Sequence, residues 1–246
     1  MAFWKLLVAT VALVAVAEAR LFELHNRLPY TIWVGTQGNS GMPAPMGGGF
    51  ELRAGQKVDI HTDEKWGGRF WARTGCRFDR NGQGLCETGD CGRKLKCGGN
   101  GGAPPATLAE FTLTGWGGQD FYDVSNVDGF NLPTTIETIN KKGGGDKYFC
   151  TTAACRADIN GQCPGELRQV VNGRTVGCKS ACLQFNTDQY CCRGAHNRPE
   201  TCRSSDWPKN YPAFFKKMCP DAYSYAYDDH KSTFKCVGTG YRVIFG

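Results

Sequence analysis

The sequence predicts a mainly β protein, a β-sandwich or barrel stabilised by disulfide bonds. Glycine is abundant, with 33 of 246 residues, short segments alternate apolar and polar residues, and turn signals recur between them. The chain also contains 14 cysteines, and an even number in an exported chain predicts up to seven disulfides. We therefore expect a β-sandwich body with two disulfide-stapled lobes inserted into it.

The first 19 residues predict a secretory signal peptide. Lys5 supplies a positive charge, an apolar stretch runs from Leu6 to Ala17, and Ala17-Glu18-Ala19 is a small-x-small cleavage site. The apolar run of 12 residues is too short to span a bilayer. We expect a secreted, extracellular protein that begins at Arg20 and has no transmembrane segment.

Period-two patterns predict the strands of the body. Ala54-Gly55-Gln56 separates two such segments and predicts a hairpin between them. The predicted strands lie within residues 22–34, 50–60, 67–73, 110–114, 121–124, 233–237 and 240–246.

Two short helices are predicted near the cysteine-dense part of the chain, over residues 178–186 and 210–218. In the second, Tyr211, Phe214, Phe215 and Met218 recur at helical spacing and define one apolar face. Lys216 and its neighbour Lys217 are expected to face outward. Residues 76–97 contain four cysteines and little apolar material, so disulfides must hold this segment in place.

The stretch from Thr107 to Pro133 contains four acidic residues, Glu110, Asp120, Asp123 and Asp128, among strand-patterned apolar residues. A carboxylate in such a segment is costly to bury unless it is paired or hydrogen-bonded. The cluster therefore predicts that one face of a sheet meets a polar cleft. The alternative is that these are solvent-side positions of half-buried strands.

Several classes of function lack support in the sequence. The chain contains no Cys-x-x-Cys pair and its four histidines are scattered, so we expect no metal and no cofactor. The net charge of +6 is modest and is not accompanied by a nucleic-acid motif, so no nucleic-acid partner is expected. No Gly-x-Ser-x-Gly elbow is present for serine hydrolase chemistry. Asp228-Asp229-His230 is expected to be a polar turn, and the chain a monomer.

Residues 82–91, Gly-Gln-Gly-Leu-Cys-Glu-Thr-Gly-Asp-Cys, closely resemble the signature of thaumatin-like proteins. Several further motifs follow in the family's order. They are 71–74 (WART), 107–111 (TLAEF), 123–125 (DVS), 128–131 (DGFN), 189–192 (QYCC), 219–225 (CPDAYSY) and 241–245 (YRVIF). The chain is thus similar to pathogenesis-related family 5 and osmotin-like proteins over almost its whole mature length.

The resemblance implies a flattened antiparallel β-sandwich with two stapled lobes. The body would take residues 20–73, 105–156 and 220–246, the small loop lobe 74–104, and the helical lobe 157–219. It also implies seven disulfides: Cys76–Cys86, Cys91–Cys97, Cys150–Cys236, Cys155–Cys219, Cys163–Cys178, Cys182–Cys191 and Cys192–Cys202. The chain departs from the family at Leu28 and Gly246, which replace the two cysteines of a terminal bridge. Arg93 replaces a usual glycine, and we expect it to lie in a solvated charged turn.

The resemblance also implies an acidic cleft between body and helical lobe. Its five residues, matched by motif, are Arg69, Glu110, Asp123, Asp128 and Asp221. Glycoside hydrolysis needs two carboxyl groups with different pKa values. We expect Glu110 to be the acid and Asp123 or Asp128 the base or nucleophile, while Arg69 and Asp221 orient substrate.

Aromatic residues beside the carboxylates are candidate sugar platforms, although an aromatic residue on a strand usually belongs to the core. The candidates are Phe121, Tyr122 and Phe130, and one of Tyr223 and Tyr225 is expected to face the cleft.

The favoured function is a secreted, antifungal defence protein that binds β-1,3-glucan or another fungal wall polysaccharide, with or without weak endo-β-1,3-glucanase activity. Binding alone needs no matched pKa values, because carboxylates accept hydrogen bonds from sugar hydroxyls. The alternative is an inhibitor of foreign hydrolases, α-amylase or protease, acting through loops of the stapled lobes. Membrane permeabilisation by a basic face is the third reading, and no strongly amphipathic basic helix supports it.

Overall fold

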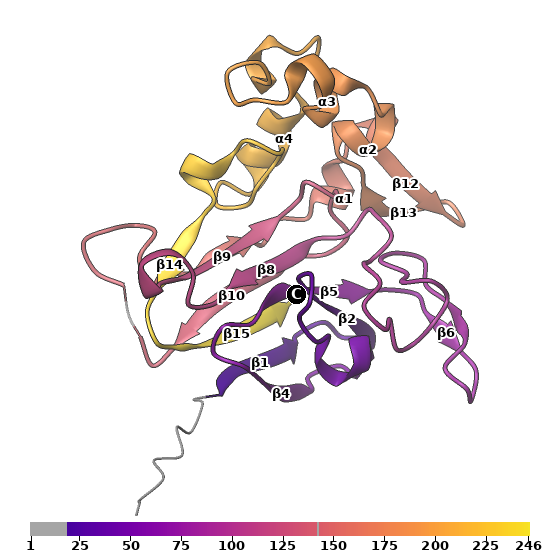
Figure 1. Cartoon of the computed structure of the whole chain (residues 1–246). Coiled ribbons are helices and arrows are strands. Elements are labelled where there is room, and N and C mark those ends of the chain that lie inside the picture. The colour runs from indigo at the N-terminus through magenta and orange to yellow at the C-terminus, as the bar shows by residue number, and fades with distance from the viewer. Residues whose placement is uncertain (1–18, 142) are drawn as a thin grey trace, which may run out of the picture.

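The computed structural model describes residues 19–141 and 143–246, and two sheets dominate it (Figure 1). The predicted signal peptide lies outside the described residues except for Ala19. The first sheet has five strands, in the order β11 (Ala153–Cys155), β10 (Thr134–Ile139), β15 (Gly240–Phe245), β1 (Arg20–Asn26) and β4 (Lys57–Thr62). The second sheet has six strands, in the order β14 (Phe234–Cys236), β9 (Asp120–Ser125), β8 (Leu108–Thr112), β5 (Gly67–Arg73), β2 (Ile32–Gly38) and β3 (Gly49–Leu52).

The two sheets pack face to face through aromatic side chains. Phe22 of β1 lies 4.8 Å from Phe111 of β8, measured between ring centroids, and 5.1 Å from Phe70 of β5. Tyr241 of β15 lies 5.1 Å from both Phe111 and Tyr122 of β9. Such pairs add specific edge and stacking contacts to the burial of large apolar areas. The fold is therefore a mainly β sandwich, as the sequence predicts, with one core between the sheets.

The predicted hairpin around Gly55 is wrong. Strand β3 pairs with β2 in the six-stranded sheet, whereas β4 pairs with β1 in the five-stranded sheet. The turn between them crosses from one sheet to the other. Period-two burial identifies the face that each strand presents to the core, but both sheets share this core, so the pattern does not identify the partner strand.

The remaining elements lie outside the two main sheets. Two small sheets join β6 (Arg77–Phe78) to β7 (Gly84–Leu85) and β12 (Arg168–Val171) to β13 (Arg174–Cys178). The α-helices are α1 (Ile159–Gln162), α2 (Ala181–Phe185), α3 (Asp188–Cys191) and α4 (Tyr211–Met218). Short 3-10 turns are η1 (Pro45–Gly48), η2 (Trp116–Gly118), η3 (Gly165–Leu167), η4 (Gly194–His196), η5 (Ser204–Asp206) and η6 (Asp229–Lys231).

The two predicted helices are present with altered details. Helix α2 begins only at Ala181, because Cys178 ends β13 and the Ser180 side chain caps the helix by accepting from Leu183 N. Helix α4 begins after Asn210, whose side chain caps it in the same way. Lys216 does not face solvent as expected, since its ammonium group lies 2.9 Å from the Asp228 carboxylate.

All 14 cysteines are in disulfides, and the seven pairs are those that the family resemblance implies. Four of the bridges join cysteines that are at most ten positions apart in the sequence. By contrast, the cysteines of Cys150–Cys236 are 86 positions apart and those of Cys155–Cys219 are 64 apart. In the chain-entropy view the two long loops restrict the unfolded chain most.

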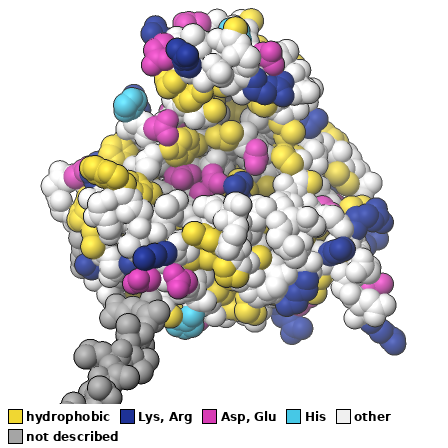
Figure 2. Space-filling view, viewed as in Figure 1, with side chains coloured by type: hydrophobic (Ala, Val, Ile, Leu, Met, Phe, Trp, Pro, Cys, Tyr) yellow, Lys and Arg dark blue, Asp and Glu magenta, His cyan; other side chains and the backbone are white. Residues whose placement is uncertain are grey.

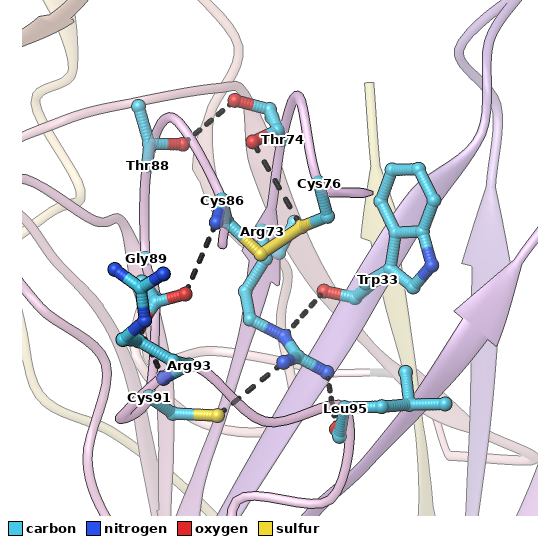
Figure 3. The surroundings of a disulfide bond; sticks show 12 residues. Trp33, Arg73, Thr74, Cys76, Cys86, Thr88, Gly89, Cys91, Arg93 and Leu95 are labelled. Atoms are coloured by element: carbon cyan, nitrogen blue, oxygen red, sulfur yellow. Dashed lines mark hydrogen bonds between the residues drawn. A yellow bond between two sulfur atoms is a disulfide. The ribbon is translucent and has the colours of Figure 1, made fainter. Parts of the chain in front are cut away.

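A buried arginine fixes the loop segment 74–104 to the six-stranded sheet (Figure 3). Arg73 ends β5 and is fully buried. Its guanidinium donates to the carbonyl oxygens of Val34 at 3.0 Å, Lys94 at 2.9 Å and Leu95 at 2.8 Å. Burial lowers the pKa of Arg73 to about 10, and the Asp90 carboxylate acts in the opposite direction. Since arginine donates in several directions at once, one side chain connects strand β2 to the loop after Cys91.

The terminal strands are held together without the family's last bridge. Strands β1 and β15 form a parallel pair in register from Phe22–Tyr241 to Asn26–Phe245. A β-carbon built on Gly246 would lie 2.8 Å from Leu28 Cγ, so the two positions that lack cysteine are in contact. The backbone N–H of Gly246 also donates to Pro133 O at 3.0 Å.

Candidate functional site

Four polar side chains form a row across the outer face of the six-stranded sheet. The strand registers pair Gln37 with Arg69, Arg69 with Glu110, and Glu110 with Asp123, on strands β2, β5, β8 and β9. Directly opposed residues share a face, with β-carbons about 5 Å apart. Figure 2 shows acidic side chains gathered in a hollow of this face, beside a basic side chain. We call this row, together with Asp128 and Asp229 beside it, the acidic cleft.

Arg69 forms an ion pair within the row. Its Nε lies 3.6 Å from Glu110 Oε1, and both side chains remain about a third exposed, at 35% and 30%. Exposed ion pairs contribute little to stability. The pair therefore has more effect on the charge of Glu110 than on the fold.

Asp128 approaches the row from the loop that follows β9. The backbone N–H of Gly129 donates to Asn126 O at 2.9 Å, and the N–H of Ala106 donates to Asp128 O at 3.1 Å, so both sides of the loop are fixed. The Asp128 side chain is half-buried, and its charge acts on Glu110. The turn thus brings a third carboxylate to the cleft.

The cleft raises the pKa of all three carboxyl groups. For Glu110, burial raises the pKa, Arg69 lowers it, Asp128 raises it and Ser125 lowers it. The pKa of Asp123 is raised well above its usual range, first by burial and then by Glu110 and Asp229, with Arg69 opposing. Burial also raises the pKa of Asp128. Neighbouring carboxylates in a partly buried site disfavour each other's ionisation.

Within the Glu110–Asp123 pair, Asp123 has the more strongly raised pKa. After burial, the largest influence on the pKa of Glu110 is Arg69, which lowers it. For Asp123, Glu110 and Asp229 both raise the pKa by more than Arg69 lowers it. The upward shift is therefore stronger at Asp123, and the two neighbouring carboxyl groups disfavour ionising together. The sequence-based expectation gives the acid role to Glu110 and the stronger shift favours Asp123, so the two assignments are alternatives, which the Glu110→Gln and Asp123→Asn variants distinguish.

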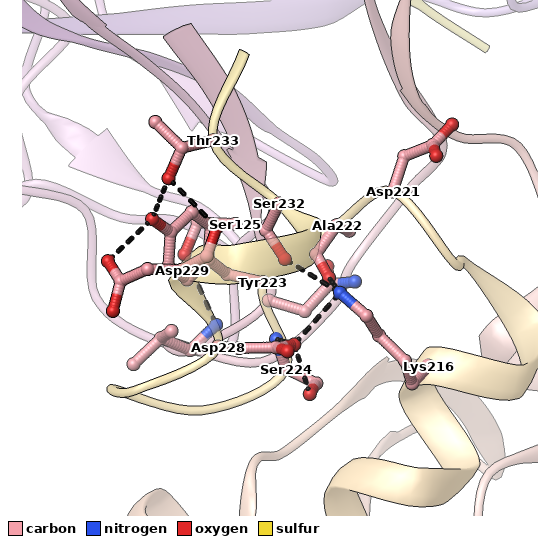
Figure 4. A network of polar contacts seen from close by, with 12 residues as sticks. Ser125, Lys216, Asp221, Ala222, Tyr223, Ser224, Asp228, Asp229, Ser232 and Thr233 are labelled. Atoms are coloured by element: carbon pink, nitrogen blue, oxygen red, sulfur yellow. Dashed lines mark hydrogen bonds and ion pairs between the residues drawn. The ribbon is translucent and has the colours of Figure 1, made fainter. Parts of the chain in front are cut away.

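Asp229 joins the cleft although the sequence predicted only a polar turn there (Figure 4). The turn exists as η6, and Asp229 Oδ1 accepts a hydrogen bond from the Tyr223 hydroxyl at 2.9 Å. Tyr223 in turn pairs with β9, since its N–H donates to Val124 O at 2.9 Å. Burial raises the pKa of Tyr223, which keeps the phenol a neutral donor. Tyr223 is thus the tyrosine of the predicted pair that lies beside Asp123.

The Asp228 side chain serves a separate network from that of Asp229 (Figure 4). Asp228 accepts from the Ser224 hydroxyl at 2.7 Å and pairs with Lys216 of α4 at 2.9 Å. Lys216 also donates to the Ser232 hydroxyl at 2.6 Å. These contacts join α4 to the segment before β14, and so fix the position of η6 and Asp229.

Asp221 forms an ion pair of its own. Its carboxylate pairs with Lys147 at 3.0 Å, and its charge also acts on Lys216. Residues 219–221 form a turn, and Ala222 N donates back to Cys219 O at 3.2 Å. The turn directs the Asp221 carboxylate to the 141–149 loop.

Two of the three predicted sugar platforms belong to the core. Tyr122 is fully buried between the sheets, and Phe130 is 1% exposed. The expectation that they stack on sugar is wrong, because strand parity places Tyr122 on the face opposite Asp123. Phe121 lies on the cleft face and is half-buried against Gly115.

Asp120 also faces the core and does not belong to the cleft. It is fully buried, and its Oδ2 accepts from Arg20 Nη1 and from the Tyr241 hydroxyl, each at 2.9 Å. Its Oδ1 accepts from the Thr114 backbone N–H at 2.9 Å. The carboxylate is therefore paired and hydrogen-bonded on both oxygens, as a buried charge requires.

In the part of the chain that the structure describes, no group of three or more His, Cys, Asp or Glu side chains is arranged to hold a metal ion. Among the same residues, no helix has the length and apolarity needed to cross a membrane.

The raised pKa of Asp123 predicts a pH-dependent stability change. The folded protein binds this proton more tightly than the unfolded chain, so the free energy of unfolding falls as pH rises from about 4 through the raised folded-state pKa. Asp123→Asn removes this loss. We expect the variant to be more stable than wild type at pH 7 and close to it near pH 3.5, measured by thermal unfolding. Glu200→Gln, at an exposed position, should not show this difference.

The two-sheet sandwich and its seven disulfides define a class of disulfide-stapled β proteins, and this chain carries an acidic row across one outer face of the sandwich. The model described as "Thaumatin family" matches residues 26–246. The chain therefore belongs to the thaumatin family.

Two curated relatives are similar over most of their length. Pathogenesis-related protein 5 of Arabidopsis thaliana is 53% identical over 224 residues, which cover 91% of this chain and 89% of that protein. A glucan endo-1,3-beta-glucosidase of Prunus avium is 47% identical over 232 residues, covering 93% and 91%.

Among solved structures, a laminaripentaose-producing β-1,3-glucanase of Paenibacillus barengoltzii, of glycoside hydrolase family 64, has the same type of fold. The alignment gives a TM-score of 0.58 with 13% identity and covers 93% of this chain and 75% of that one. At this identity the likeness concerns the fold alone.

Proposed function

We propose that this chain is a secreted, monomeric defence protein that binds β-1,3-glucan of fungal cell walls in the acidic cleft. The observation that carries the proposal is the row of Arg69, Glu110 and Asp123 across three adjacent strands. Its carboxyl and guanidinium groups are partly exposed and point to one side of the sheet, where a polymer can lie along them. A neutral sugar with hydroxyl donors and acceptors suits this set.

Two further features support glucan as the ligand. The Tyr223 hydroxyl and the Gln37 amide extend the donors and acceptors at the two ends of the row. The Prunus avium relative, 47% identical, is named for action on a 1,3-β-linked glucan. The alignment covers more than nine-tenths of both chains, and we therefore propose the same substrate class for this chain.

The Glu110–Asp123 pair gives the cleft the groups for slow hydrolysis. Protonated Asp123 would donate to the glycosidic oxygen as the C–O bond breaks, and ionised Glu110 would attack the anomeric carbon. Water would then release the sugar from Glu110 as Asp123 takes up a proton. Opposed residues with β-carbons about 5 Å apart suit the ~5–5.5 Å carboxyl spacing of retaining enzymes better than the ~6.5–9.5 Å of inverting ones.

A pull-down on insoluble β-1,3-glucan tests the binding. We expect wild type to bind, and Asp123→Ala/Asp128→Ala to bind at least about tenfold more weakly, because two hydrogen-bonding carboxyl groups are lost and each such bond is worth about 1 kcal/mol. The matched control, Asp206→Ala/Glu200→Ala, removes two exposed carboxylates elsewhere and should bind like wild type. Thermal unfolding confirms that each variant is folded.

Failure of wild type to bind the polymer would refute glucan binding. Inhibition of an α-amylase or a protease that persists in the Asp123→Ala/Asp128→Ala variant would then favour the inhibitor function, which does not use the acidic cleft.

A further inference from the structure

We propose that Trp116 is a stacking platform for one sugar ring, which extends the acidic cleft along the sheet as an additional glucan subsite. The inference rests on the proposed function, because it concerns how far along the sheet the same polymer is held. No residue of the 113–119 loop was among the candidates from the sequence.

Among the residues that the structure describes, Trp116 is far more exposed than any other large apolar side chain. It is 85% exposed, and the next large apolar residue in the described part of the chain, Val170, is 55% exposed. Trp66, Trp71 and Trp207 are at most 6% exposed. An indole gains much from burial, so an almost fully exposed one contributes little to the fold and is available for a ligand.

The loop that carries Trp116 lies on the cleft side of the sheet. A β-carbon built on Gly115 would lie 3.1 Å from the ring of Phe121 and 3.3 Å from the Thr112 side chain. Both of those residues share a face with Asp123, because residues two apart on a strand, and residues directly opposed in register, point the same way. At about 3.4 Å per residue, the loop lies roughly 10–14 Å from Asp123 along β9. A glucan of a few units can reach both.

Hydrogen bonds fix the turn that carries Trp116. Thr114 N donates to Asp120 Oδ1 at 2.9 Å, and the Thr114 hydroxyl donates to Glu64 O at 2.8 Å. Gly115 N donates to Gln119 O at 2.7 Å, which closes the turn. A preorganised platform loses little conformational freedom when a ligand binds.

The turn also leaves room for a polymer around the indole. Gly117 and Gly118 both adopt positive φ, at +67° and +71°, and a β-carbon on either would meet nothing within 4 Å. The two residues after Trp116 thus carry no side chain that could cover the indole, which is 85% exposed to an approaching pyranose ring. A single indole is far smaller than the roughly 800 Å² per partner of a stable protein interface, which favours a sugar over a second copy of the chain.

Affinity for oligomers of two lengths tests the subsite. Laminaritriose can occupy the acidic row, whereas laminarihexaose can also reach the loop. We expect Trp116→Ala to weaken laminarihexaose binding about tenfold and to leave laminaritriose binding unchanged, measured by calorimetry. Trp116→Phe, which keeps an aromatic face, should restore most of the affinity. The control Val170→Ala, at another exposed apolar position, should change neither affinity.

The outcomes separate this inference from the proposed function. Equal affinities of wild type and Trp116→Ala for laminarihexaose, or an equal loss for both oligomers, would overturn the subsite and leave glucan binding in place. Wild type that binds neither oligomer would overturn both proposals. A wild-type dimer in sedimentation that Trp116→Ala abolishes would assign the indole to self-association and also overturn the subsite.

Discussion

Replacing Glu110 by glutamine is expected to lower the release of reducing ends from soluble β-1,3-glucan by about 10²–10⁴-fold, the usual contribution of a positioned carboxyl group. The amide keeps the shape and hydrogen-bonding capacity of the side chain but cannot form a glycosyl ester. Binding to the insoluble polymer should therefore stay within a few-fold of wild type. The Glu200→Gln variant is the matched control for both assays.

A second substrate separates the roles of the two carboxyl groups. An aryl β-glucoside with an acidic leaving group needs little proton donation, so Asp123→Asn should keep much of its activity on this substrate while Glu110→Gln should not. The reverse pattern would show that Glu110 is the acid, as the sequence suggested. If wild type binds glucan and releases no ends, the cleft is a binding site only and the catalytic roles are wrong.

Replacing Asp120 by alanine is expected to lower the free energy of unfolding by about 3–5 kcal/mol, because the change leaves Arg20 without its partner and removes the acceptor of the Tyr241 hydroxyl. Asp120 is fully buried, so water cannot take its place readily. For a chain of this size the loss corresponds to a fall in Tm of roughly 10 °C or more. Calorimetry of the oxidised protein is the direct measurement.

Two comparisons test the cause of that loss. The control Asp206→Ala, at an exposed position, should change Tm by little. Arg20→Met should destabilise the protein as well, because the Asp120 carboxylate then stays buried without a cation. A change below about 1 kcal/mol in Asp120→Ala would contradict the structural role of the carboxylate.

Much of the fold was predictable from residue patterns. Period two located β5 and β15, and helical spacing located α4. The disulfide pairing came from the family resemblance, and the structure has the same seven pairs. Partner strands were less predictable, because β3 and β4 both present apolar residues to one shared core.

The candidate site divides in the same way. Strand parity could have separated Asp120 from Asp123, because residues three apart on one strand point to opposite faces. Asp221 and Asp229 lie in turns, where no period fixes the direction of a side chain. The position of Asp229 beside Asp123 depends on the Lys216–Asp228 ion pair and on the hydrogen bond from the Tyr223 hydroxyl to Asp229. These contacts join a helix to irregular segments, and no repeating sequence pattern predicts them.

The contact between Arg20 and Asp120 gives the proposed signal-peptide cleavage a consequence for folding. If the signal peptidase cuts after Ala19, the first residue of the mature chain is the one that neutralises the buried carboxylate. A cut one position later would still yield a chain with every cysteine and every cleft residue, but with an uncompensated charge in its core. Quality control that retains unstable chains would then discriminate between the two products. The cleavage position is in this sense part of the information that specifies the native state.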